Sequence, residues 1–378
     1  MLFRSDARFK EYDQKLRAVP TMNVALTVVA AFLDGLKDSH TYFQPPARSY
    51  TIDYGYRLAV IGDAVFVERV KPETDAVAKV RAGDRVLSIN GGAVSRESFQ
   101  RMQYLLNVLQ PQPSLRLALS DPVGLERTVA VETQVTQGRA LRNLSGAGAG
   151  LELQEMELAE EAERHRLRHR HVVEGDVMIW KMPIFLSENG EIDAMFAIAR
   201  KAKTLILDLR GNPGGRVDTL RRMLGNLFPS DVTIGTRVTR KGKSPLVAKS
   251  RGADAFSGRL IVLVDAGSGS SAELLARVVQ LEHRGTVLGD RSAGAVMEAR
   301  MFPFAQVAPT LIAYAFTVTD ADLVMTDGRS LEGQGVVPDE PVLPGGADLA
   351  AGRDPVMARA AALAGVTLDR SEEHTSEL

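Results

Sequence analysis

Two segments of the sequence place small and polar residues directly after an apolar run, where a buried strand would pass into a helix. The first runs from Leu205 to Gly215 and ends in a glycine-rich turn. Such a turn presents backbone N–H groups beside a helix N-terminus, which suits the stabilisation of an oxyanion. It lacks the Gly-Lys-Ser/Thr of a phosphate loop, so nucleotide binding is a poor interpretation. A strand-to-helix turn without chemistry explains this segment equally well.

The second segment, from Ile261 to Leu274, contains Ser270 three residues before Glu273. This spacing is typical of a capping box, in which the serine only caps the helix. The small neighbours of Ser270 also leave its hydroxyl open to a substrate, and a helix start favours the negative charge that forms during acylation. The local sequence is compatible with both roles.

A serine nucleophile needs a general base, and few side chains qualify. The chain has no cysteine and six histidines, so thiolate catalysis, disulfides and cysteine-based metal sites are excluded. Three histidines lie in a charged stretch and one near the C-terminus, which leaves His40 and His283. His283 falls at the end of an expected helix, where a histidine serves the helix dipole. His40 directly follows an apolar helix, which would hold its imidazole firmly, as a base requires.

The elements that must position these residues follow from the hydrophobic pattern. The first, residues 22–36, has the spacing of an amphipathic helix. Between Tyr54 and Gln134 the pattern predicts short strands and one helix. From Val177 onward, apolar strands alternate with helices, which predicts βα units around a buried sheet. The expected strands are 57–61, 65–70, 85–89, 115–119, 128–131, 177–184, 204–209, 260–264, 286–288, 299–304 and 311–318, and the expected helices are 96–109, 192–202, 217–228 and 272–280.

Residues 139–175 differ from both of these regions, because acidic residues 152–163 precede basic residues 164–171. This order complements a helix dipole and predicts a linker or an inserted, exposed helix. His165, His169 and His171 are close enough to bind a metal across one turn, but histidines alone do not complete a closed site. We therefore expect no metal.

Composition limits the function classes further. The 378 residues include 46 basic and 47 acidic side chains, a formal net charge of -1, which creates no global field for nucleic acid or an anionic membrane. The longest apolar run, residues 24–33, is too short for a bilayer, which takes about 20 residues. The length predicts two or three domains.

Four motifs occur in an order that is far more specific than any one of them: Asp208–Gly215, Val264–Glu273, Val287–Gly294 and Glu332–Asp339. Together they resemble the tail-specific, or C-terminal processing, serine peptidase family. The resemblance covers roughly residues 24–341. It implies an α/β fold with a core related to the crotonase and Clp peptidase fold, polypeptide substrates and no cofactor. Residues 54–135 are similar to the PDZ domain that these peptidases carry.

The resemblance also assigns catalytic residues. Ser270 falls on the family's nucleophile. The better-known branch of the family uses a lysine base in a Gly-Lys pair, but this sequence reads Gly294-Ala295 at that site. The other branch, typified by the tricorn protease, uses a histidine preceded by serine and a late glutamate, which correspond to Ser39, His40 and Glu332.

Other residues follow by the same resemblance. The N–H groups of Gly215 and Ser271 would hold the oxyanion. The loop containing Gly55, Tyr56 and Arg57 would bind the carboxylate of an extended peptide that adds to the sheet edge. The alternative is that the PDZ-like domain binds no peptide and only gates the core.

The expected organisation assigns the whole chain. The ranges are an N-terminal helical segment with Ser39 and His40 (1–50), a PDZ-like domain (54–135), a linker or charged helix (139–175), a peptidase core (176–345), a C-terminal segment (346–369) and a translated sequencing adapter (370–378). The N-terminus lacks the pattern of a secretory signal, whereas the resemblance implies an extracytoplasmic bacterial protein. An oligomer is left open.

Two rival functions come from other classes. One is a catalytically silent relative that binds peptides or an apolar ligand. The other is an acyl-CoA hydratase or related enzyme of the crotonase fold, which would use the same oxyanion chemistry. The pairing of Ser270 with His40 and the PDZ-like segment favour the peptidase over both.

Overall fold

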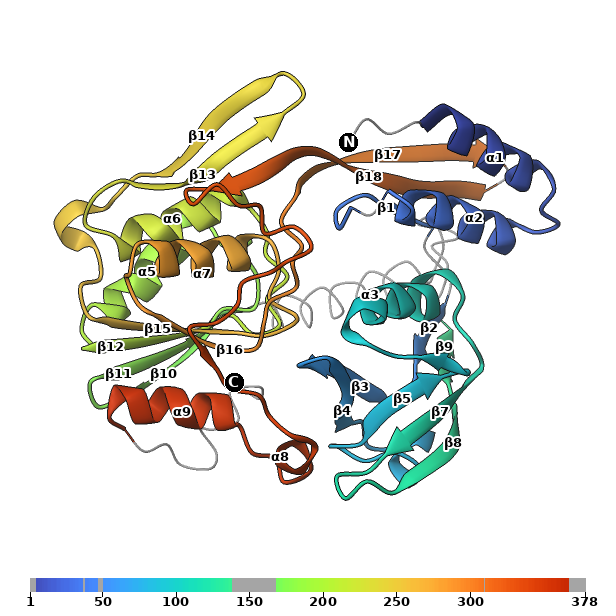
Figure 1. Ribbon diagram of the computed structural model, residues 1–378, viewed down its shortest axis with the longest axis horizontal. Coiled ribbons are helices and arrows are strands. Elements are labelled where there is room, and N and C mark those ends of the chain that lie inside the picture. The colour runs from blue at the N-terminus through green and yellow to red at the C-terminus, as the bar shows by residue number, and fades with distance from the viewer. Residues whose placement is uncertain (1–4, 37, 47–49, 138–167, 309, 367–378) are drawn as a thin grey trace, which may run out of the picture.

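The computed structural model describes residues 5–36, 38–46, 50–137, 168–308 and 310–366. Three larger sheets organise these residues (Figure 1). The first is a six-stranded sheet in the order β10-β11-β12-β15-β16-β19, in which all strands except β10 run parallel. Its strands are β10 (Arg170–Glu174), β11 (Val177–Lys181), β12 (Thr204–Asp208), β15 (Arg259–Val264), β16 (Thr286–Gly289) and β19 (Glu340–Pro341). The parallel order confirms the expected α/β class.

Helices cover both faces of this sheet because its strands are apolar on both sides. Helices α5 (Asn189–Ala199), α6 (Val217–Leu227) and α7 (Ser271–Leu281) lie on one face (Figure 1). On that side Trp180, Leu207 and Val262 are fully buried against them. The alternate residues, such as Ile206 and Leu263, pack with α9 (Pro355–Ala364) on the other face. This alternation holds the strand ends that carry both candidate motifs.

A second, antiparallel sheet extends from the core as an arm. It contains β13 (Val232–Thr239), β14 (Gly242–Ala248), β17 (Glu298–Ala308) and β18 (Thr310–Met325). Strand β18 pairs with β13 near the core, and residues 315–317 of β18 pair with β1 (Tyr42–Gln44) further out. Helices α1 (Ser5–Arg17) and α2 (Met22–Asp34) lie beside this outer part (Figure 1). The N-terminal segment is thereby fixed to a strand from late in the chain.

The third sheet, called here the small sheet, has the antiparallel order β3-β4-β5-β7-β8, with β6 (Gly92–Ala93) paired to β5. Its strands are β3 (Tyr56–Ile61), β4 (Ala64–Val70), β5 (Arg85–Ile89), β7 (Ser114–Ser120) and β8 (Glu126–Glu132). Val65, Val67 and Leu117 form its own hydrophobic cluster, with Phe99 and Met102 from α3 (Arg96–Tyr104) and Leu106 from the π-helical turn η2 (Leu105–Leu109) packed against them. Strand β3 is an edge of this sheet.

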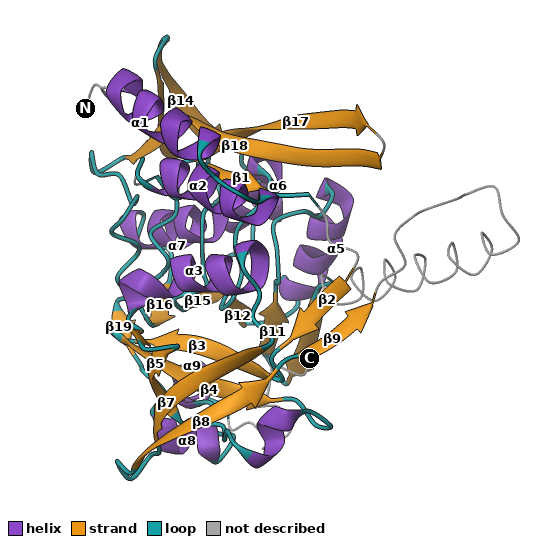
Figure 2. Cartoon of the chain, turned by 90° about the vertical axis from the view of Figure 1, so that its right-hand side faces the viewer, coloured by secondary structure: helices purple, strands orange, loops and turns teal. Residues whose placement is uncertain are grey.

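Short elements complete the description. Strands β2 (Tyr50–Asp53) and β9 (Gln134–Gln137) pair where the chain enters and leaves the small sheet (Figure 2). The others are η1 (Asp75–Ala78), η3 (Gly252–Asp254) and α8 (Gly346–Ala350). None of the helices in the described part of the chain has the length and apolarity needed to cross a membrane.

One expected boundary needs correction. Residues 139–175 are expected to be a linker or charged helix, but their last part, Arg170–Glu174, is strand β10 and pairs with β11. This strand was overlooked because it begins within the basic stretch 164–171 and contains no fully buried residue. Residues 139–167 lie outside the described residues.

Candidate active site

Ser270 adopts a backbone conformation that a simple helix cap does not require. It precedes α7 with a φ of 50° and a ψ of −116°, and its N–H donates to the Glu273 carboxylate at 3.0 Å, which is the backbone half of the expected capping box. A capping serine has β-region angles and accepts a hydrogen bond from the first turn of the helix. Positive φ at a residue with a side chain is strained, and such strain concentrates at functional sites. A sharp strand-to-helix turn of this kind exposes a serine hydroxyl.

The glycine-rich turn at residues 211–215 lies directly against Ser270. A Cβ atom on Gly214 would fall 2.5 Å from the Cβ of Ser270, and one on Gly215 would fall 2.4 Å from the carbonyl oxygen of Phe185. The φ values of these glycines, 98° and 141°, also exclude ordinary side chains. The hydroxyl of Ser271 donates to the Gly215 carbonyl oxygen at 3.0 Å. Glycine is therefore required for the two motifs to meet.

Two backbone N–H groups at this junction have no acceptor among the residues that the structure describes: those of Gly215 and Ser271. Ser271 is buried, where backbone donors are almost always paired, so its N–H indicates a place for an external acceptor beside the exposed Gly215. Their residues are the expected oxyanion donors. Asn212 supports the arrangement, because its side chain donates to Met182 and accepts from Gly214, while its carbonyl accepts from Gly269.

The fully buried carboxylate of Glu273 holds the Ser270 turn against the loop of residues 290–295. It accepts four hydrogen bonds: from the Ser292 hydroxyl at 2.6 Å, and from the N–H groups of Gly294 at 2.7 Å, Ala295 at 2.9 Å and Ser270 at 3.0 Å. Burial raises the pKa of Glu273, and the four donors oppose this effect. The sequence indicated only a capping residue here, because the partners of the carboxylate lie about 20 residues downstream.

His40 begins a short hydrogen-bonded relay that ends at Glu332, 293 positions after Ser39 in the sequence. Its Nδ1 atom lies 2.7 Å from the Ser39 hydroxyl, and that hydroxyl donates to Glu332 Oε2 at 2.9 Å. Glu332 Oε1 also accepts from the Ser39 N–H at 2.9 Å. The structure therefore brings together the three residues that the sequence assigned to the base and its orienting groups.

This relay fixes the tautomer of His40. The single hydroxyl proton of Ser39 is directed to Glu332, so Ser39 can only accept at its contact with the ring. The proton of a neutral His40 must then lie on Nδ1, which leaves Nε2 with a free lone pair. An imidazole in this state is ready to take a proton at Nε2.

Asp38 orients the same segment, although the sequence did not single it out. Its carboxylate accepts from the His40 N–H at 2.9 Å and from the hydroxyls of Thr41 at 3.1 Å and Thr319 at 2.6 Å. Burial lowers the pKa of His40, while the charges of Glu332 and Asp38 act in the opposite direction. His40 is consequently neutral at neutral pH. The only sequence signal was an aspartate two residues before the histidine.

Residues 295 and 296 connect the serine half of the site to the histidine half. The Ala295 carbonyl accepts from the Ser270 N–H at 2.9 Å, and the Val296 N–H donates to Glu332 Oε2 at 2.9 Å. No hydrogen bond joins the Ser270 hydroxyl to the His40 ring, both of which lie in the described part of the chain. Catalytic hydrogen bonds are often long before substrate binds.

A second serine and histidine pair shows the opposite tautomer. Trp180 Nε1–H donates to His169 Nδ1 at 2.9 Å, so the proton of the neutral ring is on Nε2, 2.5 Å from the Ser187 hydroxyl. This histidine donates to its serine and cannot take the serine proton. Among the described residues, no group of three or more histidine, aspartate or glutamate side chains is arranged to hold a metal ion.

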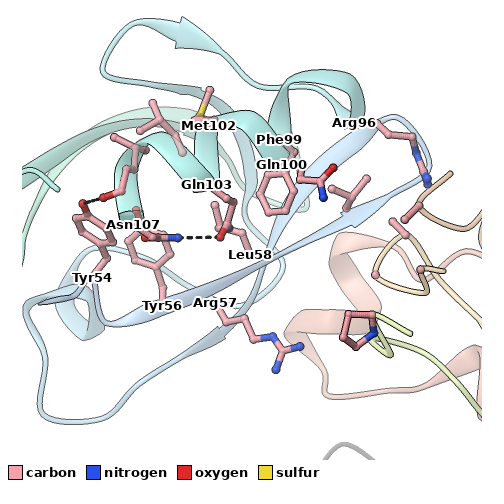
Figure 3. Close-up of a pocket in the computed structure, with 18 of the residues that line it drawn as sticks. Tyr54, Tyr56, Arg57, Leu58, Arg96, Phe99, Gln100, Met102, Gln103 and Asn107 are labelled. Carbon is pink, nitrogen blue, oxygen red and sulfur yellow. Dashed lines mark hydrogen bonds between the residues drawn. The ribbon is translucent and has the colours of Figure 1, made fainter. Parts of the chain in front are cut away.

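A cavity of about 520 Å³ lies between β3 and α3 of the small sheet and reaches the nucleophile turn (Figure 3). Leu58, Phe99 and Met102 form part of its apolar lining, and Gly269 and Ala295 line its core side. In the loop that was expected to bind a peptide carboxylate, the Gly55 N–H already donates to the Asp53 side chain at 2.8 Å. This donor is therefore occupied within the protein.

The other two residues of that loop line the cavity. The Tyr56 hydroxyl is buried without a partner within the described residues, and burial raises its pKa. The guanidinium of Arg57 approaches the glycine-rich turn, since a Cβ on Gly211 would lie 3.9 Å from it. In Figure 3, the Tyr56 ring points toward Asn107, and the Arg57 side chain leaves β3 in the opposite direction, away from α3.

Comparison with known proteins shows similarity in sequence and in fold. Residues 176–342 match the model of "Peptidase family S41". A carboxy-terminal-processing protease of Bartonella bacilliformis is 26% identical over 178 residues, 45% of this chain and 39% of that protein. A carboxyl-terminal-processing protease of Synechocystis sp. is 30% identical over 137 residues, 36% of this chain and 30% of that protein. The matched segments thus span 39% and 30% of these relatives' lengths.

A solved structure extends the likeness to nearly the whole fold. Mature CPAF complexed with lactacystin superposes with a TM-score of 0.66 at 15% identity, covering 92% of this chain and 90% of that one. Residues 176–342 are thus similar to peptidase family S41, and the relatives named here are C-terminal processing proteases. The resemblance expected from the four motifs is confirmed.

Proposed function

We propose that this protein is a serine peptidase that cleaves extended or unfolded polypeptides through an acyl-enzyme on Ser270. The relay from Glu332 through Ser39 to His40 is the observation that carries the proposal. It leaves His40 Nε2 as a base, and residues 295 and 296 join the relay to the strained Ser270 turn. A solvated Glu332 near Arg329 would make no such contacts.

The arrangement supports a complete acyl transfer. Ser270 Oγ attacks the peptide carbonyl carbon as His40 Nε2 takes the hydroxyl proton. The N–H groups of Gly215 and Ser271 receive the oxyanion, and one such donor is worth about 3 kcal/mol of barrier. The C–N bond then breaks as His40 returns the proton to the leaving amine. Water, deprotonated by His40, releases the acyl group and restores Ser270.

We further propose that residues 54–135 form a PDZ-like domain that recruits or gates substrate, and that residues 176–345 form a crotonase-related core. An antiparallel sheet capped by α3 with its own hydrophobic cluster supports the first assignment. The free edge of β3 suits an added peptide strand. The cavity beside β3 extends to Gly269, so a polypeptide on this edge would lead to Ser270.

Labelling with a fluorophosphonate probe tests the catalytic assignment. We expect the wild-type chain to be labelled, and Ser270→Ala and His40→Ala to lose labelling while keeping their thermal unfolding temperatures. Ser187→Ala is a matched control, because Ser187 also contacts a histidine but one of the wrong tautomer. Unchanged labelling of Ser270→Ala, or its absence in folded wild type, contradicts the proposal.

The second candidate function is a silent homologue that binds peptides or an apolar ligand. The missing hydrogen bond between Ser270 and His40 and the apolar lining of the cavity favour it. Tight binding of a peptide without turnover or labelling would support this alternative. The acyl-CoA hydratase alternative predicts binding of coenzyme A, which equilibrium dialysis would detect.

A further inference from the structure

Helix α3 contacts both halves of the candidate site from its two ends. Arg96, its first residue, reaches the loop that holds the serine turn, and Tyr104, its last residue, reaches the strand that follows His40. Figure 1 shows this helix between the small sheet and α2. The Ser95 hydroxyl caps the helix by accepting from the Ser98 N–H, and the Ser98 hydroxyl accepts from the Ser95 N–H. The helix is thus a defined spacer between two distant segments.

The Arg96 guanidinium binds the serine half through a nearly buried network. It donates to the Gly62 carbonyl at 2.7 Å, to the Arg291 carbonyl at 2.9 Å and to Asp290 Oδ2 at 2.5 Å. The side chains of Arg96 and Asp290 are each only 11% exposed. Removing one partner of such a pair leaves an uncompensated buried charge. The pair therefore has one strongly preferred geometry.

This network continues to the nucleophile without a break. Asp290 and Arg291 precede Ser292, whose hydroxyl donates to Glu273, and Glu273 accepts from the Ser270 N–H. A displacement of Arg96 would therefore change the position of the loop that fixes Ser270.

At the other end, the Tyr104 hydroxyl donates to the carbonyl oxygen of Phe43, three residues after His40. Burial raises the pKa of Tyr104 to about 12, so the hydroxyl keeps its proton at neutral pH. Beyond η2, Gln110 Nε2 donates to Thr27 Oγ1 of α2 at 2.7 Å. The C-terminal end of α3 is therefore fixed to the segment that carries the base.

We propose that α3 sets the separation between Ser270 and His40, and that Arg96 and Tyr104 are positioning residues for the reaction. This inference rests on the proposed peptidase function. It adds a second connection between the two halves, beside the one that residues 295 and 296 make. Neither residue exchanges a proton with substrate.

Steady-state kinetics on an internally quenched peptide tests the proposal. We expect Arg96→Met to lower kcat by about 10- to 100-fold, because a displacement of about 1 Å can cost that much in rate. Tyr104→Phe should lower kcat less. Arg96 also lines the cavity, so loss of a substrate contact alone would raise KM and leave kcat unchanged. Arg96→Lys should recover part of kcat, and exposed Arg116→Met serves as the control.

The double variant gives a sharper criterion. If α3 acts as one spacer, freeing either of its ends already lets the distance between Ser270 and His40 change. The double variant of Arg96→Met and Tyr104→Phe should then lower kcat by less than the product of the two single effects. Wild-type kcat in folded Arg96→Met, or an equal loss in Arg116→Met, overturns the inference.

Amide hydrogen exchange separates this inference from the peptidase proposal. In Arg96→Met we expect faster exchange at the Gly294 and Ala295 N–H groups, which donate to Glu273. An unlabelled, inactive wild type that still shows this change would overturn the peptidase function and keep the spacer. Unchanged exchange would overturn the spacer even in an active enzyme.

Discussion

The Ser271 hydroxyl donates to the Gly215 carbonyl oxygen at 3.0 Å, across 56 positions of sequence. This contact links the residues whose N–H groups have no acceptor among the described residues. It also joins the turn after β12 to the helix after β15, two neighbouring parallel strands whose C-terminal ends meet at one edge.

Ser271→Ala keeps the backbone N–H but removes this tether. We expect kcat to fall by about 10-fold, because a displaced donor forfeits part of the roughly 3 kcal/mol that one oxyanion contact supplies. KM should change little. Steady-state kinetics measure the effect, with Ser187→Ala as the control variant. An unchanged kcat in Ser271→Ala would show that this hydrogen bond does not position the donors.

Ser39→Ala breaks the relay between His40 and Glu332 while leaving both end residues in place. The ring then loses the acceptor that keeps its proton on Nδ1, so we expect kcat to fall by about 100-fold. Ser39→Thr retains a hydroxyl and should keep more activity. Equal activity of the alanine and wild-type chains would mean that Glu332 and Ser39 do not orient the base.

The pH profile of kcat/KM reports the state of His40. The base must be neutral, and burial lowers the pKa of His40 below the usual value for a histidine, about 6.5. Activity should therefore persist as the pH falls through 6.5 and disappear only at lower pH. Glu332→Gln removes a charge that raises this pKa, so its acid limb should lie at still lower pH, with a smaller kcat at neutral pH. An acid limb that moves to higher pH in Glu332→Gln would contradict the assignment of Glu332 as the partner of His40.

Glu273→Gln tests the buried carboxylate. An amide nitrogen would face N–H and O–H donors, leaving buried groups unpaired at a cost of about 1–3 kcal/mol in the free energy of unfolding. Urea unfolding measures this loss, and probe labelling of Ser270 should slow. Glu188→Gln is the control, because the Glu188 side chain is 76% exposed. Wild-type stability would show that the four bonds contribute little.

Ala295→Lys in a His40→Ala background tests the choice of base. A lysine base needs surroundings that lower its pKa, and one substitution does not create them. We expect no recovery of turnover, measured on the same quenched peptide. Full recovery would show that this site can use a lysine base.

The sequence predicted elements best where local pattern and tertiary packing agree. Strand β5 was predicted at its observed bounds, 85–89, and the helix predicted over 96–109 is α3 followed by a π-helical turn. The hairpin β13–β14 was missed, because residues 242–245 are exposed and polar and their pattern resembles a loop. Helix α1 falls within the expected helical segment 1–50 but was given no bounds of its own, since its surface is mostly charged.

The site was predictable only in part for a different reason. Ser39, His40 and Glu332 came from a resemblance, since no local pattern links residues 293 positions apart. Asp38 acts through contacts with Thr319, and Glu273 through contacts with residues 292–295. Such roles depend on where β18 and the loop after β16 lie in the folded chain. The spacing of residues along the sequence does not reveal these positions.

The distance in sequence between Ser39 and Glu332 also affects biosynthesis. Residues 39 and 270 leave the ribosome well before residue 332, and β18, which holds the His40 segment, is completed only at residue 325. Until then the imidazole has neither its supporting strand nor its carboxylate. The proposed hydrolytic site therefore stays incomplete in a nascent chain until residue 332 has been translated.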